Sequence, residues 1–336
     1  MSVTLPELVC PAGSLPALKM AVDRGADCVY CGLKDETNAR NFSGLNFDTT
    51  SLREGIRYAH QHRRKVLLAI NTYAQAGQSE RWRHAVDQAA EFGVDAVILA
   101  DMGLLAYAAQ THPHLRLHLS VQGSATNYEA INYCHERFGV VRAVLPRVLT
   151  LLQVEQVIRH TPVEIEVFGF GSLCVMVEGR CLLSSYVTGE SPNTHGVCSP
   201  AKAVRWNQTP KGMQSRLNGM LIDQYADGEN AGYPTLCKGR FDVHDEIYYA
   251  LEEPTSLNVL SVLPDLLRIG VAAIKVEGRQ RSPAYVGQVT QILRAALDAC
   301  ADDAGRYSVK PSWAAALNKV AEGQQATLGA YSRPWK

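Results

Sequence analysis

Short apolar runs alternate along most of the chain with longer segments in which apolar residues recur every three or four positions. The first pattern is typical of buried parallel strands, and the second is typical of the amphipathic helices that cover them. Several helical segments end in glycine just before the next strand, as glycine readily adopts the left-handed conformation that ends a helix. Eight runs are predicted to be strands: residues 8–13, 28–33, 66–72, 96–101, 117–122, 143–148, 164–170 and 272–278.

This alternating order predicts the fold class, an α/β, TIM-like (β/α)8 barrel with a cysteine-rich insertion after the seventh strand. Strands that alternate with helices pair in parallel through right-handed crossovers, and eight such units close a barrel. A doubly wound open sheet is the alternative, but no G-x-G-x-x-G turn follows the first strand. We expect 1–170 to hold the first seven strands, 171–255 the insertion, 256–305 the barrel closure, and 306–336 a C-terminal tail that packs on the barrel or on a partner.

Composition excludes several classes of protein. The 336 residues are 46% hydrophobic and 20% charged, and 33 Lys and Arg balance 33 Asp and Glu, so no overall charge attracts nucleic acid or an anionic membrane. No apolar run approaches the ~18 residues of a membrane span, and the N-terminus lacks a secretory pattern. We therefore expect a cytoplasmic protein whose nine cysteines are not disulfide-bonded.

Four cysteines lie in the insertion, within a Gly-rich stretch that has no clear period: Cys174, Cys181, Cys198 and Cys237. The intervening gaps of 6, 16 and 38 residues are too irregular for a zinc ribbon, which usually offers two close pairs. Thiolates gathered from separate loops commonly hold an iron-sulfur cluster. Because an insertion after a barrel strand leaves from its C-terminal end, where barrels place active sites, the sequence predicts a metal site at the barrel mouth.

The other five cysteines occur in apolar strand or helix patterns and are predicted to be packing residues: Cys10, Cys28, Cys31, Cys134 and Cys300. Cys28 and Cys31 form a C-x-x-C pair, but in a strand residues three apart point to opposite faces. This pair is therefore predicted to form neither a shared metal site nor a disulfide.

Polar residues follow several predicted strands and are candidates for substrate binding at the mouth: Asn71, Arg147, Lys275, Glu277 and Arg279. The last three alternate along one strand and should point to the same side. They could bind a carboxylated small molecule, with Arg279 as a bidentate clamp. The alternative is structural, because strand-end Asn often caps a helix and neighbouring Arg and Glu often form an ion pair.

Long segments of the chain resemble the collagenase-like peptidase family U32, and in particular its members that act in ubiquinone biosynthesis. The resemblance covers nearly the whole chain. It implies a [4Fe-4S] cluster on Cys174, Cys181, Cys198 and Cys237, a heterodimer with a UbiV-like sister protein, and oxygen-independent ring hydroxylation of a ubiquinone precursor with prephenate as hydroxyl donor. The segments that carry it include ELVCPAGSLPALKMAVDRGADCVYCGLKDETNARNF, FGFGSLCVMVEGRC, HGVCSPAKAVRW, YPTLCKGR and IKVEGRQRSPAYV.

Three other functions are weighed against this one. Peptidase activity is poorly supported, since the chain has neither H-E-x-x-H nor a G-x-S-x-G elbow around Ser172. RNA hydroxylation is a second possibility within the family, although the neutral charge and the lack of a long basic stretch weigh against it. In the third possibility, which is non-catalytic, the cluster only stabilises a scaffold protein that binds a partner.

Overall fold

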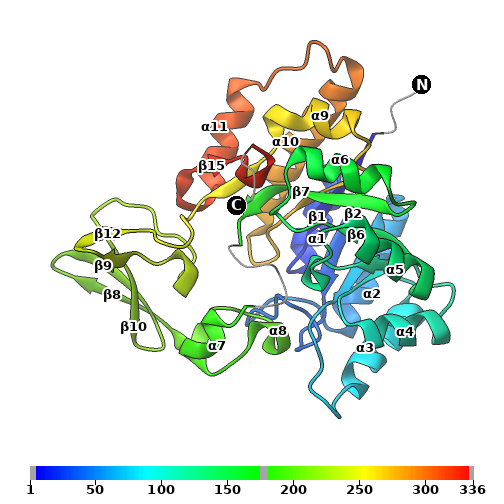
Figure 1. The fold of residues 1–336 in the computed structure, drawn as a ribbon, viewed down its shortest axis with the longest axis horizontal. Coiled ribbons are helices and arrows are strands. Elements are labelled where there is room, and N and C mark those ends of the chain that lie inside the picture. Colours follow the sequence, from blue (N-terminus) through cyan, green and yellow to red (C-terminus); the bar gives the residue numbers. More distant parts are fainter. Residues whose placement is uncertain (1–4, 175–180, 333–336) are drawn as a thin grey trace.

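The computed structural model describes residues 5–174 and 181–332, and its centre is a closed parallel barrel surrounded by helices (Figure 1). Within this part of the chain, eight strands pair side by side in the order β14-β1-β2-β3-β4-β5-β6-β7, and β7 pairs with β14 to close the ring. The predicted fold class is confirmed. The barrel strands are β1 (Glu7–Pro11), β2 (Cys28–Gly32), β3 (Lys65–Ile70), β4 (Ala96–Leu99), β5 (Leu117–Leu119), β6 (Val140–Val144), β7 (Glu164–Ser172) and β14 (Ala273–Val276).

Helices follow the strands and cover the outside of the barrel. Several begin at side-chain caps, as where Asn127 accepts from a backbone N–H of the first turn, and α3 and α5 end at the predicted glycines Gly93 (φ 71°) and Gly139 (φ 73°). The covering helices are α1 (Leu15–Asp23), α2 (Thr49–Gln61), α3 (Glu80–Phe92), α4 (Met102–Thr111), α5 (Tyr128–Phe138), α6 (Leu151–Arg159), α9 (Leu263–Arg268) and α10 (Pro283–Asp302).

The hydrophobic core has two parts. A large cluster fills the space between the strands and the helices, and a smaller one, which includes Cys28 and Tyr30, lies inside the barrel. Cys31 belongs to the outer cluster, so the C-x-x-C pair does point to opposite faces as predicted. All five cysteines predicted to be packing residues are buried, whereas the four in the insertion are only partly buried.

The sixth strand was placed too late by the sequence pattern. Residues 143–148 were predicted, but β6 spans Val140–Val144. Pro146 lacks a backbone N–H for a strand ladder, and the chain turns there towards α6, which Thr150 caps. The apolar run AVLPRV therefore contains the end of the strand and the start of the following loop.

The insertion between β7 and β13 (Ser256–Asn258) contains more regular structure than its sequence pattern predicts. After α7 (Leu183–Thr188) and α8 (Pro192–His195) it forms an antiparallel sheet and a hairpin, and Figure 1 shows these strands projecting from one side of the barrel. Its strands are β8 (Val204–Thr209), β9 (Gly212–Leu217), β10 (Met220–Tyr225), β11 (Phe241–Val243) and β12 (Glu246–Tyr248).

The chain returns through β13 (Ser256–Asn258), which pairs antiparallel with the end of β7. After α10, α11 (Pro311–Val320) leads to β15 (Ala326–Thr327), which pairs with β13. The C-terminal segment is thereby held against the point where the insertion leaves and rejoins the barrel. In the described ranges, no helix combines the length and apolarity needed to cross a membrane.

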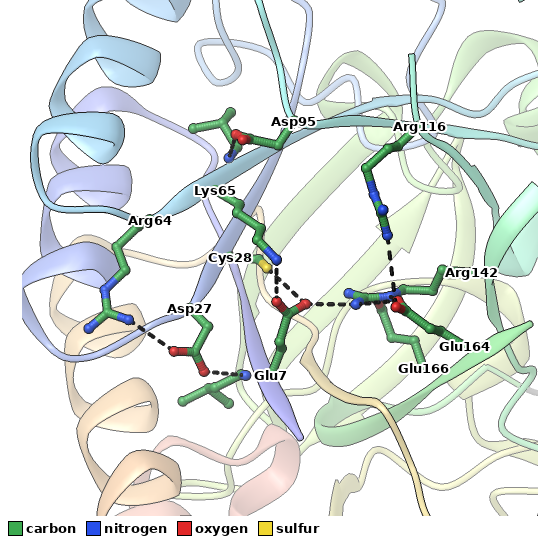
Figure 2. A network of polar contacts seen from close by, with 12 residues as sticks. Glu7, Asp27, Cys28, Arg64, Lys65, Asp95, Arg116, Arg142, Glu164 and Glu166 are labelled. Carbon is green, nitrogen blue, oxygen red and sulfur yellow. Dashed lines mark hydrogen bonds and ion pairs between the residues drawn. The ribbon is translucent and has the colours of Figure 1, made fainter. Parts of the chain in front are cut away.

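A network of charged side chains occupies the N-terminal end of the barrel (Figure 2). Arg142, which is buried, reaches Glu7 at 2.7 Å and Glu164 at 2.6 Å, and Glu7 also accepts a 2.5 Å hydrogen bond from Lys65. Although burial acts to raise it, the pKa of Glu7 is lowered to about 2 by Lys65 and Arg142. The network therefore stabilises the ionised form of Glu7.

We expect the free energy of unfolding to decrease as the pH falls from about 4.5 to about 2, since over that range the unfolded chain takes up the Glu7 proton and the folded chain does not. Solvent screening at this partly exposed site limits the contribution to roughly 2 kcal/mol. Urea unfolding across this pH range measures it. A Glu7→Gln variant should lose this part of the pH dependence, and an unchanged profile in the variant would contradict the assignment.

Candidate metal centre at the barrel mouth

Side chains from the C-terminal ends of several strands converge on one pocket at the barrel mouth. All five residues predicted to bind substrate line it, together with Tyr30, Arg40 and Phe168 from the neighbouring strands and loops. The five are Asn71 after β3, Arg147 after β6, and Lys275, Glu277 and Arg279 on and after β14. Lys275 is on β14, whereas Glu277 and Arg279 follow its end at Val276, so the three charged groups line one pocket although strand alternation does not extend to the last two.

Lys275 is held deep in this pocket. Its ammonium lies 2.7 Å from Oε1 of Glu166 and 3.8 Å from the centre of the Tyr30 ring, and both charged side chains are buried. Burial lowers the pKa of Lys275, while Glu166 acts in the opposite direction. Glu166 also lies 3.6 Å from Arg142, so it connects the mouth to the network at the other end of the barrel.

The other two charged groups of β14 face the loop after β2. Arg279 donates to Oδ1 of Asn38 at 2.9 Å, and burial lowers its pKa to about 10. Glu277 lies 3.7 Å from Arg40. Part of the donor set of Arg279 is therefore already used within the protein. This contact is a structural role, in contrast to that of a substrate clamp.

The pocket is narrow, with a volume of about 40 Å³. Pockets for small molecules are usually several hundred Å³. A ligand with more than a few atoms therefore requires side chains at the entrance, such as Arg40, to move, or it must bind across the opening.

The cysteines of the insertion approach this mouth from outside the barrel. Burial first, and then the charges of Cys198 and Cys174, raise the pKa of the Cys237 thiol to about 12, so these three thiols are electrostatic neighbours. Cys181 stands at the edge of the described residues, where its carbonyl oxygen accepts a hydrogen bond from the Asn193 side chain at 3.3 Å.

The candidate donors are all thiols, the ligand type that iron-sulfur clusters use. In the ranges 5–174 and 181–332, no three His, Cys, Asp or Glu side chains converge on a point that could hold one ion. A four-iron cluster binds each cysteine through a different iron, so its thiols need not share one point. Neighbouring thiols repel one another when they are ionised. Bound iron would offset this repulsion and stabilise them as thiolates.

Arg40 connects the thiols to the pocket. Burial acts to lower its pKa, but Glu277 and then Cys198 and Cys174 raise it, so the guanidinium that lines the pocket is close enough to interact with two of the cysteines. The loops are also in close contact: a Cβ at Gly196 would lie 2.4 Å from the carbonyl oxygen of Asn38. The Cys198 loop is thus packed directly on the loop that carries Arg40.

Comparison with known proteins identifies the family. The model of peptidase family U32 matches residues 13–333. This chain belongs to family U32. The family predicted from the sequence is thereby confirmed.

Several curated U32 relatives resemble the chain over most of its length. An uncharacterized protease of Methanocaldococcus jannaschii is 35% identical over 301 residues, which cover 88% of this chain and 66% of that protein. The tRNA hydroxylation protein P of Helicobacter pylori is 31% identical, with 94% and 69% covered. A 23S rRNA 5-hydroxycytidine synthase of Escherichia coli is 28% identical, with 89% and 40% covered. The chain spans about two thirds of the length of the first two relatives and less of the third.

The U32 name includes the word peptidase, but Ser172 does not have the surroundings of a serine nucleophile. Its hydroxyl donates to Glu322 at 2.8 Å. A catalytic serine requires a base, most often histidine, that accepts this proton. The contact observed here instead ties Ser172 to the C-terminal segment of the chain.

Two buried charged residues inside the barrel were missed by the sequence analysis: Glu166, which pairs with Lys275 of the mouth, and Arg142, at the opposite end. Both lie within apolar strands, Glu166 in EIEVF and Arg142 in VVRAV, where a charged residue that alternates with buried neighbours signals an inward-facing side chain. Nothing in the local sequence of Arg40 places it beside the cysteines.

Proposed function

We propose that this U32 protein is the iron-sulfur subunit of an oxygen-independent hydroxylation system. Its cluster would be a [4Fe-4S] centre on Cys174, Cys181, Cys198 and Cys237, and its substrate a ubiquinone precursor that is hydroxylated on the ring. The protein would act in the cytoplasm as a heterodimer with a UbiV-like sister protein. Relatives named as hydroxylation proteins support the reaction class.

The position of Arg40 is the observation that carries this proposal. It lines the mouth pocket, pairs with Glu277, and interacts electrostatically with Cys174 and Cys198. A cluster on these thiols would therefore lie next to the pocket. A cluster with only a structural role would not need to be close to it. When bound, it would supply redox-active or Lewis-acidic iron there.

The pocket has the charge for a carboxylated donor such as prephenate. Four cationic side chains line it: Arg40, Arg147, Lys275 and Arg279. They are opposed by Glu277 in the pocket lining and by Glu166, which pairs with Lys275. Because cationic side chains outnumber carboxylates here, the pocket favours an anionic ligand. Guanidinium groups are well suited to bind its carboxylate.

Anaerobic purification together with the partner tests the proposal. We expect a brown protein with about four iron and four sulfide per chain, and accumulation of unhydroxylated quinone precursors when the gene is deleted and cells grow without oxygen. A colourless zinc protein, or unchanged quinone production in the deletion strain, would contradict it.

Replacing Arg279 with alanine should weaken the use of the carboxylated substrate. Loss of a charged hydrogen bond costs about 1.5–3 kcal/mol, so kcat/KM should fall by about tenfold or more. Iron content should stay unchanged. Arg116→Ala is the control, because Arg116 is half exposed and lies at the opposite end of the barrel. Equal kcat/KM in the two variants would rule out the clamp.

RNA hydroxylation is the second candidate, because the curated relatives include proteins named for tRNA and 23S rRNA hydroxylation. Mass spectrometry of nucleosides from the deletion strain separates the two. Loss of a hydroxylated nucleoside with normal quinone levels would favour RNA, and the reverse result would favour the quinone precursor.

A further inference from the structure

Glu322, in the C-terminal segment, has a buried carboxylate with an unusual set of partners. Its side chain is 5% exposed. Oε2 accepts from the Lys238 ammonium and from the Ser172 hydroxyl, and Oε1 accepts from the backbone N–H of Tyr233 at 2.8 Å. The two oxygens thus receive three donors from two segments of the chain, one with Ser172 and the other with Tyr233 and Lys238.

Each donor belongs to a segment that carries one of the candidate ligands. Ser172 precedes Cys174 by two residues, and Lys238 directly follows Cys237. The third connection runs through the backbone next to Tyr233: the Ser199 hydroxyl donates to the carbonyl oxygen of Pro234 at 2.7 Å, and Ser199 directly follows Cys198. The carboxylate therefore holds the segments of Cys174 and Cys237 directly, and that of Cys198 through the Ser199–Pro234 hydrogen bond.

Glu322 itself is held firmly in place. Its backbone N–H donates to the Ser256 hydroxyl at 2.9 Å. The next residue, Gly323, has φ +60°, and a Cβ there would lie 2.3 Å from the carbonyl oxygen of Pro254. The C-terminal segment is thus fixed on the strand that leads back into the barrel, so it provides a rigid base for the three contacts.

Charge makes this contact sensitive to substitution. Lys238 and Glu322 are both buried, with side chains 4% and 5% exposed. Removing one partner of a buried pair leaves the other charge uncompensated, and the surrounding segments then shift to solvate it. Groups around metal ligands that fix their orientation typically change metal affinity by about 10–100-fold when they are replaced.

We propose that Glu322 is a positioning residue that sets the relative placement of Cys174, Cys198 and Cys237 for cluster assembly. This role rests on the proposed iron-sulfur function, but it also makes a claim about the metal-free protein. Without the Glu322 carboxylate, the three thiols lose their common anchor. With it, they are held ready for iron before any iron binds.

The test compares wild type with Glu322→Gln, with Glu322→Gln combined with Lys238→Met, and with Glu229→Gln. Glutamine keeps the size of the side chain but sets its amide against the Lys238 ammonium, and Lys238→Met removes that unpaired charge. Glu229 pairs with Arg240 on the partly exposed side of the insertion and serves as the matched control.

Two measurements are made on each protein: alkylation rates of individual thiols in the metal-free form, and iron retained against a chelator after anaerobic reconstitution. We expect Glu322→Gln to alkylate faster at Cys198 and Cys237 and to retain iron about tenfold less tightly. The double variant should recover stability, because the unpaired charge is gone, but not the slow alkylation or the iron retention, because the anchoring carboxylate is still absent. Glu229→Gln should match wild type. Any cluster left in Glu322→Gln should have a more positive reduction potential, since the Lys238 charge is no longer neutralised.

These readouts separate the two proposals. If wild type takes up no iron, the proposed function fails, and the alkylation rates still decide the positioning role. If Glu322→Gln matches wild type in alkylation and in iron retention, the positioning role is overturned whether or not the cluster exists. Circular dichroism checks that each variant is folded. Wild-type alkylation and iron retention in the double variant would assign the effect to the unpaired Lys238 charge and would also overturn the positioning role.

Discussion

Replacing Cys198 with alanine should remove nearly all of the iron from the anaerobically purified protein and abolish hydroxylation. Cys198 lies in a loop packed on the Arg40 loop, and its charge acts on both Cys237 and Arg40. It is therefore at the centre of the candidate site. Iron per chain should fall from about four to near zero, since a cubane cluster that lacks one thiolate ligand is readily lost. Iron and sulfide analysis with visible absorption measures this.

The matched control is Cys134→Ala. Cys134 is buried on α5 against the barrel, away from the insertion. Loss of its sulfur should lower stability by about 1 kcal/mol through a small cavity, but iron content should stay as in wild type. Full iron in the Cys198 variant, or equal losses in both variants, would remove the basis for the metal centre. The same replacement at Cys181 tests the fourth ligand.

The largest effect on stability is expected from Glu166→Gln. The Glu166 carboxylate is fully buried and pairs with Lys275 and Arg142. Its neutralisation leaves the buried Lys275 without its counter-charge, while Arg142 keeps Glu7 and Glu164. This should lower the free energy of unfolding by about 3–5 kcal/mol. Because whole domains are stable by only about 5–15 kcal/mol, this loss should be evident in urea or thermal unfolding.

Glu164→Gln is the control on the same strand. Glu164 also contacts Arg142, but its side chain is 43% exposed, so the loss should be about 1 kcal/mol or less. Adding Lys275→Met to Glu166→Gln should restore part of the stability, because the unpaired ammonium is then gone. Similar losses for Glu164→Gln and Glu166→Gln would mean that burial does not control the strength of this pair.

Local patterns in the sequence were sufficient for the fold and for most of the candidate chemistry. Strands, helices and their glycine ends follow from periodicities of a few residues, which depend on near neighbours. The sixth strand was misplaced because its apolar run continues past Val144 through Pro146. Residues there are still hydrophobic, but the strand has already ended. The division of the cysteines into five buried and four partly buried was likewise visible in their neighbouring residues.

The ion pairs could not be predicted in the same way, because they join residues that barrel closure brings together. Glu166 and Lys275 are 109 positions apart, and Glu322 and Lys238 are 84 apart. No local period encodes such pairs, and a charged residue in a strand shows only that it needs a partner. The approach of Arg40 to both the pocket and the thiols depends equally on how the insertion packs.

The sequence by itself thus determined a (β/α)8 barrel, a U32 resemblance, a set of four cysteines and three charged residues at the end of the last strand. The tertiary structure alone decided that these residues, Asn71 and Arg147 surround one narrow pocket, that Arg40 is near both this pocket and the thiols, and that Glu322 holds two cysteine segments directly and a third through Pro234. The reason is physical. Secondary structure depends on the spacing of nearby residues, whereas a buried charge is stable only beside an opposite charge, which the closed barrel can bring from a distant part of the chain.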